Sequence, residues 1–217
     1  MAVAPHGEGG NGEARRFWEA HYRAHQRVWS GSANAVLVDV AGPLPAGTAL
    51  DLGCGEGGDA VWLARLGWRV TAVDVSPTAL ERADRHAAEA GVAGRVTTER
   101  HELGRSFPDG TYDLVSAAFL HSPVELPRED VMRQAAAAVA PGGRLVVLGH
   151  AGAPSWAPPE HVAHAHFPTP QQVLDDLELP QDGWRAERTE LVERTDTGPQ
   201  GQTGLLEDSL VVVRRLT

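Results

Sequence analysis

A glycine-rich segment between an apolar run and an amphipathic run limits the fold of this chain more than any other feature. Residues 49–58 read ALDLGCGEGG. The run at 48–52 predicts a short strand, and a helix is expected at about 59–66. Glycines at such a turn let a ligand approach the backbone because no Cβ intervenes, and the helix N-terminus presents free N–H groups. The segment therefore predicts a cofactor-binding loop.

The rest of the chain alternates between strand-like and helix-like patterns. Further strands are expected at 69–73, 95–99, 112–117, 144–149, 185–194 and 208–215, and further helices at 76–90 and 128–139, the second stopped by Pro141-Gly142-Gly143. This alternation predicts an α/β fold with a doubly wound, mostly parallel sheet and helices on both faces. The linker TDTGPQGQTG between the last two strands is too long for a tight hairpin.

A length of 217 residues favours one domain, expected at 13–217 after a Gly-rich disordered tail at 1–12. Aromatic residues at helical spacing predict an amphipathic helix at 13–29, and Ser32 or Asn34 is expected to cap a second helix that runs to about Val40. Residues 13–45 would form a helical lid. The Pro- and His-rich stretch at 150–170 would form an insert that covers the substrate and leads into a short helix capped by Thr169.

Two cofactors compete for the glycine loop. Gly53, Gly55 and Gly58 satisfy the G-x-G-x-x-G pattern of dinucleotide sites, so a nicotinamide-dependent oxidoreductase remains open. Asp51, two residues before the first glycine, favours a cation over a diphosphate. S-adenosylmethionine carries an ammonium and a sulfonium but no phosphate. Asp74, at the end of the second strand, is placed to accept both hydroxyls of a ribose in either case.

Four ordered motifs across residues 48–149 carry a family resemblance: ALDLGCGEG, TAVDVS, YDLVSA and APGGRLVVLG. In these the sequence resembles the class I S-adenosylmethionine-dependent methyltransferases. The resemblance implies a Rossmann-like sheet of seven strands with the last strand antiparallel. The aromatic N-terminal helix and the compact length resemble most the branch of thiopurine and tellurite methyltransferases.

The resemblance also implies a set of cofactor contacts. Asp51 would lie near the methionine ammonium, Asp74 would bind the ribose hydroxyls, and Val75 would pack on adenine. Glu102 stands where the family often places an acid that accepts from the adenine amino group. The implied cofactor-binding residues are Asp51, Gly53, Cys54, Gly55, Asp74, Val75, Glu102, Leu103 and Ala118.

Methyl transfer is an in-line displacement that requires an aligned acceptor, and it requires a base only when the acceptor is a hydroxyl or a protonated amine. The candidate bases are His121, just after the fourth strand, and His25, beside the aromatic helix. The expected substrate pocket comprises Trp18, Tyr22, Trp29, His166 and Phe167. Core packing of the aromatic side chains, and a surface or capping role for the histidines, remain open alternatives.

The charge and composition of the chain limit the class of methyl acceptor. The net charge of −10 disfavours nucleic acid as a partner, so a small-molecule thiol, hydroxyl or amine is expected. One cysteine, no apolar run of membrane-spanning length and no signal-peptide layout favour the cytoplasm. His164 and His166 would point to one side of an extended segment, but the flanking prolines indicate an irregular loop, so no metal is expected. A non-catalytic, cofactor-binding sensor of the same fold remains an alternative.

Overall fold

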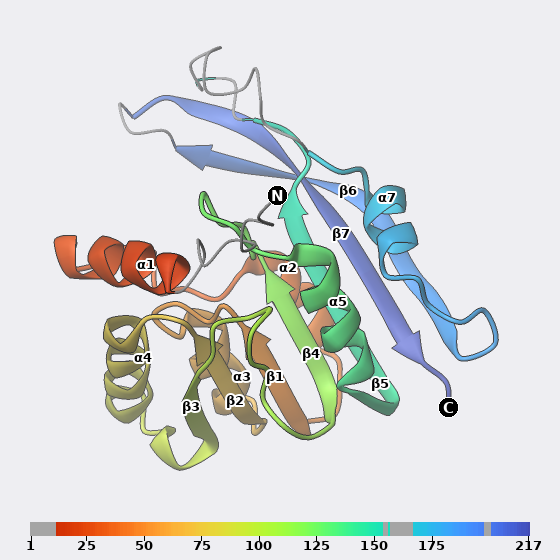
Figure 1. Ribbon diagram of the computed structural model, residues 1–217, viewed down its shortest axis with the longest axis horizontal. Coiled ribbons are helices and arrows are strands. Elements are labelled where there is room, and N and C mark those ends of the chain that lie inside the picture. The colour runs from red at the N-terminus through yellow and green to blue at the C-terminus, as the bar shows by residue number, and fades with distance from the viewer. Residues whose placement is uncertain (1–11, 154–155, 157–166, 198–200) are drawn as a thin grey trace, which may run out of the picture.

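The computed structural model describes residues 12–153, 156, 167–197 and 201–217, which form a seven-stranded sheet in the order β3-β2-β1-β4-β5-β7-β6 (Figure 1). Strands β1 to β5 are parallel, and β7 is antiparallel to both β5 and β6. The strands are β1 (Thr48–Leu52), β2 (Arg69–Asp74), β3 (Val96–Arg100), β4 (Tyr112–Ala118), β5 (Val139–His150), β6 (Trp184–Thr197) and β7 (Thr203–Arg215). The predicted doubly wound sheet with an antiparallel last strand is confirmed.

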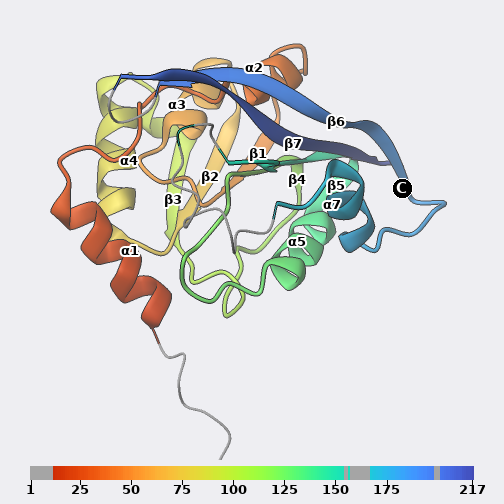
Figure 2. The same ribbon diagram turned by 90° about the horizontal axis from the view of Figure 1, so that it is seen from above.

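Helices cover both faces of the sheet (Figure 2). They are α1 (Glu13–Ala24), α2 (Ala35–Ala41), α3 (Gly58–Arg65), α4 (Pro77–Glu89), α5 (Arg128–Ala137) and α7 (Pro170–Asp176), with a 3₁₀ turn at Ala93–Arg95. Successive strand residues point to opposite faces. Accordingly, Ala49 packs in the layer under α2 and α3, whereas Leu50 packs in the layer under α5 and α7. Both faces of the central strands are therefore buried.

The strand order reverses between β1 and β4. From β1 the chain winds outward through β2 and β3, then returns to pair β4 with the other side of β1. In open α/β sheets, ligands bind at this switch point, beyond the carboxyl ends of the strands. The glycine loop after β1 and the turn after β4 meet there.

The strand β1 has the predicted bounds, and Ser76 caps α4 as expected, with its Oγ accepting from the N–H of Ala79 at 3.2 Å. The first helix is shorter than predicted. It ends at Ala24, and His25 is already extended, with φ −126°. Trp29 therefore lies on a loop rather than on the helix.

The linker between β6 and β7 is shorter than predicted, because only residues 198–202 separate the two strands. The two strands pair without interruption from Trp184↔Arg215 to Thr197↔Thr203, except for a shift between Ala186 and Arg188. An exposed two-stranded ribbon needs no apolar face, and β-branched threonine suits a strand. The polar composition of this segment therefore concealed its strand structure.

Strand β5 also begins earlier than predicted, at Val139 rather than Arg144. Helix α5 ends at Ala137, before the predicted Val139, so the Pro-Gly-Gly step does not stop the helix and lies within β5 instead. Gly142 has φ 82°, and a Cβ on Gly143 would lie 2.9 Å from the carbonyl oxygen of Asp113. The glycines therefore allow β5 to pass close to β4 through an irregular register. No helix in the described ranges is both long and apolar enough to cross a membrane.

Candidate cofactor and acceptor site

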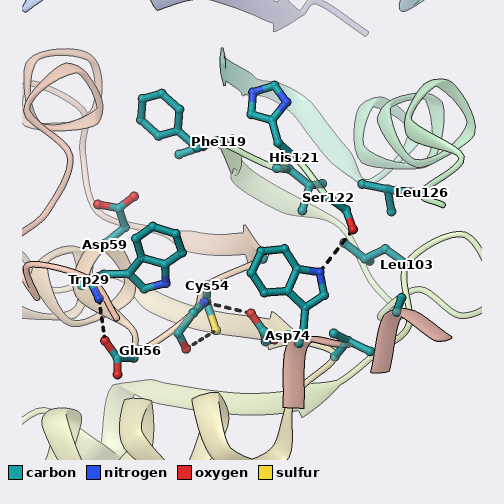
Figure 3. A pocket seen from close by; sticks show the side chains of 18 of the residues that line it. Trp29, Cys54, Glu56, Asp59, Asp74, Leu103, Phe119, His121, Ser122 and Leu126 are labelled. Atoms are coloured by element: carbon teal, nitrogen blue, oxygen red, sulfur yellow. Dashed lines mark hydrogen bonds between the residues drawn. The ribbon is translucent and has the colours of Figure 1, made fainter. Parts of the chain in front are cut away.

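A pocket of about 1190 Å³ opens at the carboxyl edge of the sheet, over the ends of β1, β2, β4 and β5. Figure 3 shows Asp74 and Cys54 on one wall and Phe119 and His121 on the opposite wall. Most of the residues predicted from the sequence line this one pocket: Trp18, Tyr22, Trp29, Gly53, Cys54, Gly55, Asp74, Val75, Glu102, Leu103, Ala118 and His121.

The glycine loop is folded back against the end of β2. The N–H groups of Gly53 and Cys54 both donate to the carbonyl oxygen of Val73 at 2.9 Å. Gly55 has φ 53°, in the left-handed region, and a Cβ there would lie 2.9 Å from Nε1 of Trp29 and 3.0 Å from the hydroxyl oxygen of Tyr22. At Gly53 and Gly55 the loop therefore offers backbone to the pocket.

Asp74 is bound on both carboxylate oxygens by backbone. Its Oδ2 accepts from the N–H of Gly55 at 3.1 Å, and its Oδ1 accepts from the N–H of Ser76 at 2.9 Å. Burial raises the pKa of Asp74 to about 6, although these N–H donors oppose the shift. Each oxygen retains a lone pair, so the carboxylate can accept two further hydrogen bonds from a vicinal diol.

The structure places Asp51 behind the glycine loop rather than on the pocket surface. The side chain is 3% exposed, and among the described residues Oδ2 has no hydrogen-bond partner. Burial raises the pKa of Asp51 well above its ordinary value, and the neighbouring carboxylates of Asp59 and Asp74 raise it further. A nearby cation would relieve this repulsion, whereas a diphosphate would increase it.

Asp59 lines the pocket where Asp51 was expected to act. It lies in the first turn of α3, and its Oδ1 accepts from the N–H of Asn34 at 2.6 Å. Burial raises the pKa of Asp59. Sequence reasoning missed this residue because an acid in the first turn of a helix is ordinarily explained by the helix dipole.

A buried ion pair fastens the segment between α1 and α2 to the glycine loop. Glu56 is 2% exposed and accepts hydrogen bonds from the N–H groups of Val28 and Trp29 and from Nη1 of Arg82. Burial opposes ionisation of Glu56, but these three donors outweigh it and lower its pKa. Nη2 of Arg82 also donates to the carbonyl oxygens of Tyr22 and His25. No local pattern in the sequence indicated this pairing.

Helix α1 is anchored on both sides of the pocket. The carboxylate of Glu19 accepts from the hydroxyls of Ser76 and Thr78 at 2.7 and 2.8 Å, which joins α1 to the start of α4. On the other side, Nε1 of Trp18 donates to Oγ of Ser122 at 3.3 Å, in the loop after β4 (Figure 3). The N-terminal segment thus forms one wall of the pocket.

The turn after β4 directs two rings into the pocket. Phe119 has φ 51°, an uncommon backbone conformation for a residue other than glycine. The N–H of His121 donates to the carbonyl oxygen of Phe119 at 2.7 Å, and Nε2 of His121 accepts from the N–H of His150 at 3.3 Å. Burial lowers the pKa of His121 to about 4, helped by Arg128 and His150.

His150 also lines the pocket, and sequence reasoning missed it as a site residue. Its Nδ1 lies 3.1 Å from Oδ1 of Asp208, a fully buried carboxylate that also accepts from Nε of Arg194 at 2.6 Å. Asp208 is the register partner of His150 on β7. A separation of 58 residues in the chain conceals this neighbour.

Other predicted residues lie outside the pocket. His25 is exposed and absent from the lining, and its Nδ1 lies 2.9 Å from the carbonyl oxygen of His21. Phe167 is half-buried and does not line the pocket either. The segment 161–166, which includes His166, falls outside the described residues. Among the residues that the structure does describe, no group of three His, Cys, Asp or Glu side chains gathers to hold a metal.

Two predicted cofactor contacts already have partners of their own. Oε1 of Glu102 lies 2.9 Å from Nε of Arg105, so this carboxylate is shared with an ion pair. The Sγ of Cys54 is 3.6 Å from the carbonyl oxygen of Gly55, and burial raises the pKa of its thiol well above the ordinary value. Cys54 is therefore a neutral packing residue at physiological pH.

Comparison with known proteins shows which family the chain resembles. Residues 49–143 match the family described as "Methyltransferase domain". A relative from Oryza sativa subsp. japonica, "Probable tocopherol O-methyltransferase, chloroplastic", is 33% identical over 147 residues, which are 66% of this chain and 40% of that protein. "Ribosomal protein L11 methyltransferase" of Burkholderia mallei is 39% identical over 106 residues, 48% of this chain and 32% of that protein. The chain thus spans less than half the length of these curated relatives.

Solved structures share the fold. One described as "Conversion of a Disulfide Bond into a Thioacetal Group during Echinomycin Biosynthesis" has a TM-score of 0.67 at 24% identity and covers 93% of this chain and 92% of its own. TehB from Haemophilus influenzae has a TM-score of 0.66 at 15% identity, covering 90% and 66%. At these identities the likeness is one of fold, and it does not distinguish between branches. By its motifs, its family match over residues 49–143 and its sheet order, the chain has the fold of the class I S-adenosylmethionine-dependent methyltransferases.

Proposed function

We propose that this protein transfers a methyl group from S-adenosylmethionine to a small-molecule acceptor. When bound, this cofactor supplies a methyl group on a positively charged sulfur. The observation that carries the proposal is the arrangement of Asp51, Asp59 and Asp74 around a glycine loop that presents bare backbone to the pocket.

The residues present fit the cofactor part by part. Asp74 would accept the ribose hydroxyls, and Val75 and Leu103 would hold the adenine ring. Gly53 and Gly55 would pass beside the methionine portion, and Asp59 would face its ammonium. Burial and the neighbouring acids raise the pKa of Asp51, and a bound ammonium would favour its ionised form, which would add to the negative potential there. Because three carboxylates gather at this end of the pocket, a diphosphate would meet repulsion.

The acceptor would bind at the other end of the same pocket, near Phe119 and His121. A cavity of about 1190 Å³ exceeds the 300–1,000 Å³ of ordinary ligand sites, so it has room for cofactor and acceptor together. The net charge of −10 supports a small molecule over a nucleic acid. Residues 13–45 would act as a lid, with Trp18, Tyr22 and Trp29 against the ligand. Most of the expected cover at 150–170 lies outside the described residues. This arrangement would suit a protein of the branch that includes the thiopurine and tellurite methyltransferases.

Calorimetry tests the cofactor. We expect S-adenosylhomocysteine to bind and NADH not to bind; binding of NADH alone would favour the oxidoreductase alternative. The substitution Asp59→Asn should weaken binding of S-adenosylhomocysteine about tenfold while leaving binding of 5′-methylthioadenosine, which lacks the ammonium, unchanged. Glu129→Gln, on the exposed surface of α5, is the matched control for loss of one negative charge.

A turnover assay tests the reaction. The protein would be supplied with a labelled methyl donor and a panel of thiols, phenols, amines and small proteins. Transfer to a small molecule supports the proposal, and transfer only to a protein would assign the acceptor to a different class. Cofactor binding without transfer to any acceptor would favour the sensor alternative.

A further inference from the structure

The carboxyl end of β5 carries a histidine held by a buried acid. His150 is the last residue of β5, and Asp208 lies opposite it on β7. The distance of 3.1 Å between Nδ1 and Oδ1 places the proton of the neutral ring on Nδ1, since an ionised carboxylate can only accept a hydrogen bond. Nε2 is then the basic nitrogen, and among the described residues it has no hydrogen-bond partner.

The surroundings of His150 fix the ring. It packs against the ring of Phe119 at a centroid distance of 4.6 Å and stacks on His121 at 5.5 Å. The carboxylate of Asp208 is itself held by Arg194, whose guanidinium carbon lies 5.5 Å from the centroid of Phe119. The imidazole is thus oriented by contacts from the turn after β4 and from β7. Its side chain remains 40% exposed, and it lines the pocket.

His121 is differently placed, although it lines the same pocket. Its Nε2 accepts the backbone N–H of His150, so the lone pair that would take a proton already has a partner. Burial and the nearby Arg128 favour its neutral form. His121 is therefore suited to hold the end of β5 in place.

We infer that His150 is the general base of the methyl transfer, that Asp208 is its positioning residue, and that the acceptor is a neutral hydroxyl or thiol. This inference rests on the proposed function. The O–H or S–H bond of the acceptor breaks, and its proton goes to Nε2 of His150. The freed electron pair forms the new bond to the methyl carbon. The carbon–sulfur bond of the donor breaks, and the sulfur keeps that electron pair and becomes neutral.

The first experiment needs no cofactor. In ¹⁵N NMR spectra of the free protein, we expect His150 to show a protonated Nδ1 and a bare Nε2, the reverse of the tautomer that prevails in water. Asp208→Asn retains an acceptor oxygen and should keep this tautomer, whereas Asp208→Ala should lose it. A bare Nδ1 in the wild-type protein would overturn the inference.

The second experiment separates the two histidines by kinetics. With a hydroxyl acceptor that is neutral at the assay pH, His150→Gln should lower kcat by about 10²–10⁴-fold and leave the affinity for S-adenosylhomocysteine unchanged. His121→Gln should lower kcat less than tenfold. A larger loss in His121→Gln than in His150→Gln would transfer the role of base to His121 and overturn the inference.

The third experiment uses the acceptor itself. An acceptor that is already ionised needs no base, so the loss in His150→Gln should shrink below tenfold for a phenol or thiol whose pKa lies below the assay pH. Asp208→Asn should follow the same trend with a smaller loss. The pH dependence of kcat should reflect more than His150 alone, because charged and titratable groups surround this ring: Asp208, Arg194, His121 and Arg128. An equal loss for neutral and ionised acceptors would mean that His150 only shapes the pocket.

These readouts keep the two proposals separate. If the wild-type protein fails to bind S-adenosylhomocysteine or transfers no methyl group, the proposed function fails, while the tautomer of His150 still decides whether the pair with Asp208 exists. If the wild-type protein turns over and His150→Gln keeps its full kcat, the base is wrong and the function stands.

Discussion

The backbone N–H of Gly55 donates to the carboxylate of Asp74 at 3.1 Å, which joins the middle of the glycine loop to the end of β2. The carboxylate of Asp74 therefore has two roles. It fixes the loop that would pass beside the methionine portion of the cofactor, and it faces the pocket where the ribose would bind. Changes at either residue should affect cofactor binding.

Gly55→Ala should weaken binding of S-adenosylhomocysteine at least tenfold. The new Cβ would lie 2.9 Å from Nε1 of Trp29, and the left-handed backbone adds about 1–2 kcal/mol of strain. Gly91→Ala is the matched control, because Gly91 has φ 72° but no atom within 4 Å of the added Cβ. Both variants should lose stability, and calorimetry should show weaker binding for Gly55→Ala alone. Equal affinities for the two variants would place the cofactor elsewhere.

Asp74→Ala should weaken cofactor binding by about 1.5–3 kcal/mol, the contribution of hydrogen bonds to a charged acceptor. The wild-type affinity should also depend on pH. Because the pKa of Asp74 in the free protein is about 6 and the ribose hydroxyls favour the carboxylate form, affinity should fall about tenfold between pH 7 and pH 5. Asp74→Asn should remove most of this slope, leaving the part due to Asp51 and Asp59. A slope that is identical in the variant would show that Asp74 does not contact the ribose.

The same carboxyl should lower the stability of the ligand-free protein at neutral pH. The pKa of Asp74 is about 6 in the folded chain, above the ordinary value of 3.8. The stability that the protonated carboxyl contributes is therefore fully present below pH 3.8, and it is lost as the pH rises through about 6. The difference corresponds to about 3 kcal/mol at most. The free energy of unfolding of wild type relative to Asp74→Asn, measured in urea, should therefore fall between pH 4 and pH 7. A rise over this range would contradict the raised pKa.

Glu56→Gln should loosen the segment between α1 and α2. Arg82 would lose its buried partner, and the N–H groups of Val28 and Trp29 would lose a charged acceptor. We expect a loss of about 1.5–3 kcal/mol of unfolding free energy and faster hydrogen exchange at 25–34. Glu89→Gln removes an exposed pair with Arg85 and should cost less than about 1 kcal/mol. Unchanged exchange at 25–34 in Glu56→Gln would mean that other contacts hold the segment.

The sequence determined the parts of the fold that local signals encode. Glycine and proline mark the ends of elements, so β1 was expected at its observed bounds and Ser76-Pro77 at the start of α4. The alternation of strands and helices was enough for a parallel, doubly wound sheet. The position of Asp74 followed from the same pattern, because a residue at the end of the second strand must reach the edge where the glycine loop lies.

Only the tertiary structure decided which distant residues meet. Asp208 faces His150 because β7 runs antiparallel to β5 in one particular register, and nothing near either residue in the chain indicates that register. Glu56 and Arg82 pair because two β–α units pack side by side. The same holds for Asp51, whose carboxylate is hidden behind the loop, and for Asp59, which lines the pocket in its place. Local sequence sets the conformation of a segment, whereas the contacts that set charge and orientation in a site are made between segments.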